Sequence, residues 1–120
     1  MNQKKETGNK GEQVAKEYLE KKGYKILDTN WHHHHRELDI IAKEDKVLVI
    51  VEVKTRTTSF YGEPSLAVNA LKMRRMINAA DSYIRRHNFD GDTRFDIISI
   101  IFEKGKYKLE HIINAFYPTL

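Results

Sequence analysis

Apolar and polar residues follow a period that changes several times along the chain, and each change marks a predicted element. Over residues 9–22 the apolar residues recur at helical spacing, and Gly23 stands where this helix would end. Three strands are predicted next, over residues 24–31, 37–43 and 47–54. Residues 32–36 would link the first two strands or extend the first one, and Glu44 and Asp45 form a polar break before the third.

The second half of the chain begins with an amphipathic helix after Pro64. Its apolar stripe comprises Met73, Met76, Ile77, Ala80, Ile84 and His87, and its opposite face carries Arg74, Arg75, Arg85 and Arg86. Residues 94–102 predict a strand buried on both faces, and a turn at residues 104–106 leads into a last strand over 108–115. The helix is a crossover, so the third and fourth strands should be parallel, in a mixed α/β sheet of order α-β-β-β-α-β-β.

The composition limits the class of protein. At 120 residues the chain is long enough for one hydrophobic core, and we expect a single domain over residues 1–120. The absence of cysteine excludes disulfides and thiolate chemistry. The first residues lack the apolar stretch of a signal peptide, and no segment approaches the roughly 20 apolar residues of a membrane span. We therefore expect a cytoplasmic protein with no membrane partner.

Positive charge is concentrated in one segment. The whole chain has 21 Lys and Arg residues against 17 Asp and Glu residues, a net charge of +4. Between residues 72 and 87 the basic residues Lys72, Arg74, Arg75, Arg85 and Arg86 are opposed by Asp81 alone. Such a local basic surface indicates a polyanionic partner, and a solvated helix face is the alternative interpretation.

Charged side chains lie at the ends of the second and third predicted strands. Because side chains alternate along a strand, Glu52 and Lys54 share a face with Leu48 and Ile50. The opposite face of that strand consists of Val47, Val49, Val51 and Val53. If the hairpin loop holds an even number of residues, Leu38, Ile40 and Ala42 join these valines. Asp39 then lies on the face of Glu52 and Lys54, whereas the other parity would place carboxylates among valines.

The carboxylates of Glu37, Asp39 and Glu52 need positive charge nearby. Two carboxylates about 5 Å apart repel by on the order of 3 kcal/mol at an effective dielectric constant of about 20. Lys54 supplies one positive charge, which leaves the group net negative, and a divalent cation with oxygen ligands would complete the balance. The alternative is a solvated sheet edge with weak cross-strand pairs.

An Asp on one strand followed by Glu-x-Lys on the next resembles the PD-(D/E)xK core of restriction endonucleases and archaeal Holliday junction resolvases. The whole chain more closely resembles the YraN-like family, which is assigned to this fold as endonucleases. The matching residues are Gly8-Asn9-Lys10-Gly11-Glu12, Gly23-Tyr24, Asn30-Trp31, Glu37-Leu38-Asp39, Val51-Glu52-Val53-Lys54-Thr55-Arg56, Gly62, Ala67-Val68, Lys72 and Arg94-Phe95-Asp96. The resemblance implies a restriction-endonuclease-like mixed sheet with flanking helices. Arg36 departs from it, because the family usually has a glycine there.

The resemblance also implies roles for the acidic residues and the lysine. Asp39 and Glu52 would bind Mg²⁺ or Mn²⁺ together with the backbone carbonyl of Val53 and waters. The metal would polarise the phosphodiester and lower the pKa of a bound water. Lys54 would orient that water or balance charge in the transition state.

Glu12 has two interpretations. Resolvase-like nucleases use a helix Glu that reaches the charged end of the sheet, and Glu12 borders the apolar stripe of its helix, so it is a fourth catalytic candidate. Alternatively, Asn9 and Glu12 form a capping-box-like pair at the start of the helix, with Glu12 also paired to Lys16.

Basic and aromatic residues after the Glu-x-Lys strand are candidates for nucleic-acid contact. The predicted phosphate contacts are Arg56, Lys72, Arg74 and Arg75. Phe60 and Tyr61 would stack on bases or, as the alternative, pack against the sheet. Asp96 begins a buried strand, where we expect a structural hydrogen-bond acceptor.

Four adjacent histidines, at positions 32 to 35, precede Arg36. In an extended segment they point alternately to two sides, so no more than two converge easily on one ion. We interpret them as a solvated loop with adventitious Ni²⁺ or Zn²⁺ affinity, although the parity of His35 leaves a supporting role at the acidic site open. Glu37 is expected to pair with Arg36 or Arg56.

The predicted function is metal-dependent hydrolysis of phosphodiester bonds in duplex or branched DNA, with RNA left open. A homodimer would suit a symmetric junction, as in the related resolvases. One alternative is a noncatalytic nucleic-acid-binding or repair-complex adaptor that keeps the nuclease fold. Another is a protein-interaction domain with an incidental acidic edge, which predicts neither metal dependence nor salt-sensitive DNA binding.

Overall fold

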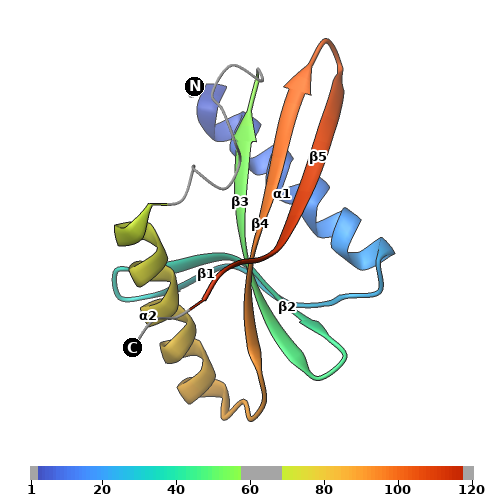
Figure 1. The fold of residues 1–120 in the computed structure, drawn as a ribbon. Helices are drawn as coiled ribbons and strands as arrows, with labels where there is room; N and C mark the ends of the chain where they lie inside the picture. The colour runs from blue at the N-terminus through green and yellow to red at the C-terminus, as the bar shows by residue number, and fades with distance from the viewer. Residues whose placement is uncertain (1–2, 58–68, 118–120) are drawn as a thin grey trace.

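The computed structural model describes residues 3–57 and 69–117, with side chains described from residue 6 onward, and it confirms the mixed α/β fold. The described elements are α1 (Gln3–Lys21), β1 (Lys25–His33), β2 (Arg36–Glu44), β3 (Val47–Arg56), α2 (Ala70–His87), β4 (Thr93–Glu103) and β5 (Lys106–Phe116). Figure 1 shows α1 and α2 on opposite sides of the twisted sheet. The architecture is therefore three layers, with helix, sheet and helix in succession.

The sheet follows the chain order β1-β2-β3-β4-β5. β3 and β4 are parallel, as the crossover predicted, and the other neighbouring strands are antiparallel. Glu44 pairs with Val47, so the β2–β3 loop holds two residues, the even number that the hydrophobic pattern required. Asp45 in this loop has a φ of 53°, which suits the tight hairpin turn.

The first helix is longer than its apolar pattern predicts. α1 begins at Gln3. The apolar pattern did not predict this start because residues 3–8 contain no apolar residue that would extend the stripe. Asn9 lies inside the helix, so the capping-box interpretation of Asn9 and Glu12 is wrong. Gly23 ends the helix as predicted, in the left-handed region with a φ of 94°. Its N–H donates to the Glu20 carbonyl at 3.0 Å, as expected of a glycine at the end of a helix.

The face of the sheet under α1 is apolar. Ala15 and Leu19 of α1 are completely buried against it. The strand residues of this layer are Ile40, Ala42, Val49, Val51, Val53, Ile98 and Ile100. The valine face of β3 is thus buried as expected, and this burial leaves Glu52 and Lys54 on the other face.

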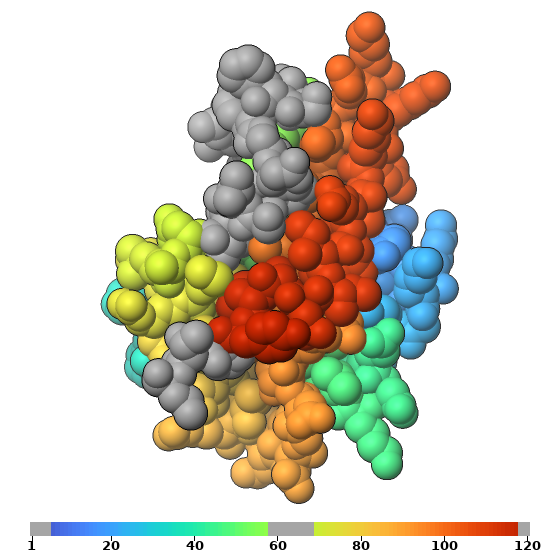
Figure 2. Space-filling model, viewed as in Figure 1, coloured from blue at the N-terminus to red at the C-terminus, as the bar shows by residue number. Residues whose placement is uncertain are grey.

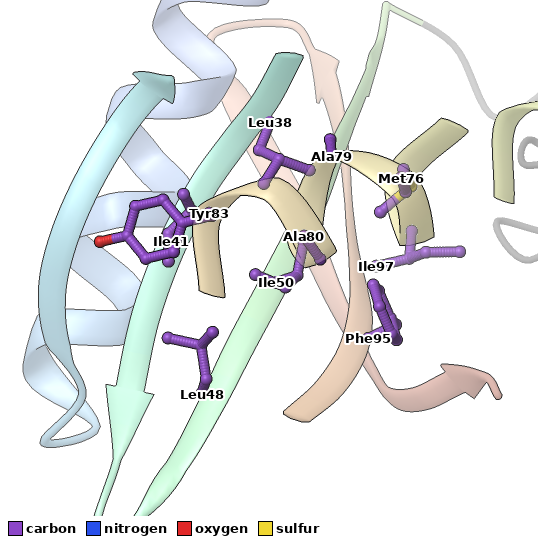
Figure 3. Packing of buried hydrophobic residues seen from close by; sticks show 10 residues of the cluster. All are labelled: Leu38, Ile41, Leu48, Ile50, Met76, Ala79, Ala80, Tyr83, Phe95 and Ile97. Carbon is purple, nitrogen blue, oxygen red and sulfur yellow. The ribbon is translucent and has the colours of Figure 1, made fainter. Parts of the chain in front are cut away.

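The opposite face packs against α2, and Figure 3 shows the buried side chains. From the helix this layer receives Met76, Ala79, Ala80 and Tyr83, and from the strands Leu38, Ile41, Leu48, Ile50, Phe95 and Ile97. Arg74, Arg75, Arg85 and Arg86 are exposed, as predicted. His87, which was expected on the apolar stripe, is instead exposed and stacks on Tyr83 with ring centroids 3.9 Å apart. The rest of the predicted stripe does contact the sheet, with Met76 and Ala80 buried and Met73, Ile77 and Ile84 partly buried, and Ala79 and Tyr83 extend it.

Leu38 does not lie on the face predicted for it. It belongs to the α2 cluster with Ile41, whereas Ile40 and Ala42 lie under α1. The pairing of β2 with β3 ends at Ile40 and Val51, but β2 stays paired with β1, where Leu38 faces Trp31. The first residues of β2 therefore turn away from β3 together with β1. The alternation of side chains between the two faces of the sheet fails at this point.

A buried polar network holds the edge strand β5, which lies at the surface in Figure 2. Asp96 is completely buried and accepts hydrogen bonds from Arg94, His111 and the Asn114 backbone N–H at 2.7 to 3.1 Å. The Asn114 bond falls where the β4–β5 register shifts. The prediction of a structural acceptor at Asp96 is confirmed.

Candidate active site

The site forms where β2 and β3 separate. The last paired residues are Ile40 and Val51, so the backbone N–H of Val53 has no β2 carbonyl to bond. Asp39 takes that place, and its Oδ2 accepts the Val53 N–H at 2.9 Å. The carboxylate of Asp39 is thereby held beside the Glu52-Val53 segment, as the register argument expected.

Glu52 is a buried carboxylate, with 5 % of the residue exposed. Burial and the charge of Asp39 raise its pKa to about 7, against the opposing effect of Lys72 and Lys54. Its Oε2 lies 3.7 Å from Lys54 Nζ and 3.5 Å from Lys72 Nζ. Two strands and a helix therefore place two carboxylates and two ammonium groups together.

Glu12 reaches the same site from α1. Partial burial and the charge of Asp39 raise its pKa, and the charge of Glu37 adds to this, while a hydrogen bond with the Asn30 side chain opposes it. The preceding Gly11 allows the approach, because a Cβ there would collide with the side chain of Thr55 on β3. The structure thus agrees with the first interpretation of Glu12, as a group near the charged end of the sheet.

Lys72 is positioned by the start of α2. Asn69 caps this helix, with its Oδ1 accepting the Lys72 backbone N–H at 2.9 Å. The first turn of α2 therefore directs Lys72 toward Glu52. Lys72 was predicted as a phosphate contact, but its ion pair with Glu52 was not predicted, since the position of α2 across the sheet is a tertiary feature.

The other predicted phosphate contacts lie around this centre. Arg56 ends β3, two residues beyond Lys54. Arg74 and Arg75 are exposed on α2 and do not enter the acidic cluster. Phe60 and Tyr61 lie outside the described residues. Beside Lys54 in the sheet is Ser99, whose buried Oγ has no hydrogen-bond partner within residues 6–57 and 69–117.

A groove adjoins the acidic cluster. It has a volume of about 380 Å³ and runs between the β1–β2 turn and α2. Its lining consists of His35, Arg36, Glu37, Lys72, Arg75, Met76 and Asn78. Lys72 thus belongs to both the groove and the ion-pair cluster.

His32 and His33 end β1, and His34 and His35 form the β1–β2 turn. Within the described part of the chain, no group of three or more His, Asp or Glu side chains is arranged to hold a metal ion. His32 lies 3.1 Å from Glu37, a contact that the sequence did not predict. His34 has a φ of 58° in the turn.

The donor set at Asp39 and Glu52 fits a hard divalent cation. Both groups are carboxylates, and the Val53 backbone between them and Lys54 adds a carbonyl oxygen, the ligand type that Mg²⁺ and Mn²⁺ prefer. The raised pKa of Glu52 shows that the two lysines do not fully compensate the buried negative charge. A cation bound between the carboxylates would supply the missing positive charge.

Within the described residues, neither helix is sufficiently long and apolar to cross a membrane.

Comparison with known proteins identifies the family of this chain. The model described as "Uncharacterised protein family UPF0102" matches residues 11–100. A UPF0102 protein of Parabacteroides distasonis is 46% identical over 117 residues, covering 98% of this chain and 97% of the relative. A UPF0102 protein of Geobacter metallireducens is 45% identical over 113 residues, covering 93% of each chain. These matches agree with the YraN-like motifs, and the chain belongs to the UPF0102 family.

Proposed function

We propose that this protein is a metal-dependent deoxyribonuclease that hydrolyses phosphodiester bonds in duplex or branched DNA. The observation that carries the proposal is the placement of Glu52. Its buried carboxylate lies beside Asp39 and forms ion pairs with two lysines. A purely structural ion pair would need one lysine for one carboxylate. A second carboxylate in the same place suits a site that binds a cation and an anionic substrate together.

Asp39 and Glu52, with the Val53 carbonyl, are the residues that would hold Mg²⁺ or Mn²⁺. When bound, such an ion polarises the phosphodiester and lowers the pKa of a water. Asp39 is held in place by the Val53 N–H and Glu52 by burial in the sheet. The ligands are therefore preorganised on rigid strands, which limits the rearrangement needed when the ion binds.

Lys54 and Lys72 would stabilise the negative charge that develops on the phosphate oxygens. Both ammonium groups lie within 4 Å of Glu52 Oε2 and are about one third exposed, so they can reach a substrate. Glu12 would accept a proton from the attacking water. Its raised pKa makes it a better proton acceptor than an ordinary surface carboxylate.

The test is cleavage of labelled duplex, single-stranded and four-way-junction DNA, and of single-stranded RNA, with Mg²⁺, Mn²⁺ or EDTA. The variants are Asp39→Asn, which keeps an oxygen for the Val53 N–H, and Glu52→Gln, which keeps the shape of the buried side chain. Glu20→Gln removes an exposed carboxylate from the far end of α1 and serves as the matched control.

The proposal expects metal-dependent cleavage of DNA that falls at least a hundredfold in the Asp39 and Glu52 variants and is unchanged in the Glu20 variant. Cleavage that survives both substitutions would contradict it. If the wild type cuts nothing but binds DNA in a salt-dependent manner, the noncatalytic adaptor is the better description.

A further inference from the structure

We infer that the groove between the β1–β2 turn and α2 binds a backbone phosphate of the DNA strand, next to the phosphate at the acidic cluster. The inference deepens the proposed function and rests on it. It assigns substrate contacts to Arg36 and Arg75, and it gives the charged turn of this chain a role in binding.

The groove is more positive than negative. Arg36, Lys72 and Arg75 line it, against the single carboxylate of Glu37. That carboxylate is also engaged, because His32 lies 3.1 Å from it. An anion that enters the groove therefore meets three cationic side chains, which attract phosphate.

Arg36, the first residue of β2, is held in a defined place. The Arg36 guanidinium donates from Nη1 to the Ser82 hydroxyl of α2 at 3.2 Å, which ties the start of β2 to the helix. The remaining N–H donors of the guanidinium are available to a ligand in the geometry that suits phosphate oxygens. Arg75 is exposed on the first half of α2 and provides a second guanidinium whose N–H donors can bind phosphate oxygens.

The groove is continuous with the acidic cluster through Lys72. This side chain lines the groove and also lies 3.5 Å from Glu52. A strand whose reacting phosphate sits at Asp39 and Glu52 would therefore place a neighbouring phosphate at Arg36 and Arg75. A repeating polyanion fits this linear arrangement, whereas a lone phosphate ion would occupy only part of it.

The experiment measures binding of a labelled four-way junction and of duplex DNA to the full chain in EDTA, as a function of salt concentration. Arg36→Ala, Arg75→Ala and the double variant are compared with Lys106→Ala/Lys108→Ala. The control pair is exposed on β5 and removes the same charge as the double Arg variant. Thermal unfolding checks that every variant is folded, and Arg75→Ala tests the groove without breaking the Arg36–Ser82 bond.

Each Arg substitution should weaken DNA binding about tenfold and lower the slope of log K against log salt by about 1, the value for one phosphate contact. The control should change the affinity less than about twofold. Equal losses in the control and the groove variants, or displacement of DNA by polyglutamate of equal charge, would overturn the inference. If the wild type cleaves DNA and the Arg variants bind it normally, the inference fails and the proposed function stands. If the wild type neither binds nor cleaves, both fail.

Discussion

The ammonium of Lys72 lies 3.5 Å from the buried carboxylate of Glu52, although Lys72 belongs to the crossover helix α2 and Glu52 to strand β3. Lys54, two residues from Glu52 on the same strand, is slightly farther away, at 3.7 Å. The nearer cation at Glu52 is therefore the one that the Glu-x-Lys motif does not contain. This arrangement makes Lys72 a competitor of any metal ion for the Glu52 oxygen.

Replacing Lys72 with Met should strengthen metal binding and weaken cleavage. The substitution removes a positive charge that repels the incoming cation and pairs with one of its ligands. We expect roughly tenfold tighter Mn²⁺ binding, measured calorimetrically, together with slower DNA hydrolysis. Lys46→Met, which removes an exposed lysine in the β2–β3 loop, is the matched control and should leave both unchanged. Weaker Mn²⁺ binding in the Lys72 variant would show that the lysine supports the site instead of competing for it.

Glu52→Gln should make the protein more stable at alkaline pH. Burial and the charge of Asp39 raise the pKa of Glu52 to about 7 from its ordinary value of 4.5. The folded state then binds more protons than the unfolded state between these values, so the free energy of unfolding falls as pH rises from about 4.5 through 7. Above pH 8 the Gln variant should be more stable by on the order of 2 kcal/mol, and near pH 4 the gain should vanish.

Urea unfolding at pH 4, 6 and 8 measures this difference. Glu20→Gln changes an exposed carboxylate and should give the same curves as the wild type. A Glu52→Gln protein that is less stable than the wild type at pH 8 would mean that the ion pairs with Lys54 and Lys72 outweigh the cost of burying the carboxylate.

Gly11→Ala should destabilise the protein, although alanine favours helix. The added Cβ would collide with the side chain of Thr55, with its Cβ only 3.0 Å away, so α1 would have to move from β3. We expect a loss of about 1 to 3 kcal/mol and reduced cleavage, because Glu12 would move with the helix. Gly8→Ala is the control, since nothing lies within 4 Å of its Cβ, and it should stabilise α1 by up to about 1 kcal/mol. Equal gains from both substitutions, measured by thermal unfolding, would refute the close contact.

Asp96→Asn should destabilise the fold without acting on the candidate site. Burial alone would raise the pKa of Asp96, but hydrogen bonds from His111, Arg94 and the Asn114 N–H lower it below its ordinary value. These interactions therefore stabilise the protein above the ordinary pKa of Asp, and the contribution is lost as pH falls through the lowered pKa. The free energy of unfolding of the variant should fall by about 3 to 5 kcal/mol at pH 7. The reason is that the Arg94 side chain, which is only 14% exposed, would keep its charge without the Asp96 carboxylate.

Chemical denaturation at pH 7 measures that loss, and the double variant Arg94→Met/Asp96→Asn tests its cause. Removing both charges should recover part of the stability, since the double variant no longer contains a poorly compensated guanidinium. No recovery would indicate that the bonds from His111 and Asn114, which hold β5, account for the loss.

The alternation of the β2–β3 hairpin could be read directly from the sequence. Valines at every second position of β3 fixed which face is buried under α1, because carboxylates cannot replace them there at low cost. The same requirement predicted an even number of loop residues, and the loop holds two. Glu52 and Lys54 were therefore assigned correctly to the other face. The assignment failed at Leu38, where β2 leaves β3 and turns with β1.

The sequence by itself determined the order of elements, the parallel pairing of β3 and β4, and the shared face of Asp39 and Glu52, because period and strand parity are local properties. Only the tertiary structure decided that Lys72 pairs with Glu52, that Arg36 bonds Ser82, and that Gly11 lets Glu12 approach the sheet. These contacts join side chains from α1, β2, β3 and α2, and they depend on how each helix is placed across the sheet. Hydrophobic patterning specifies which face a helix buries, whereas packing fixes its position along the strands, and that position determines which charges meet.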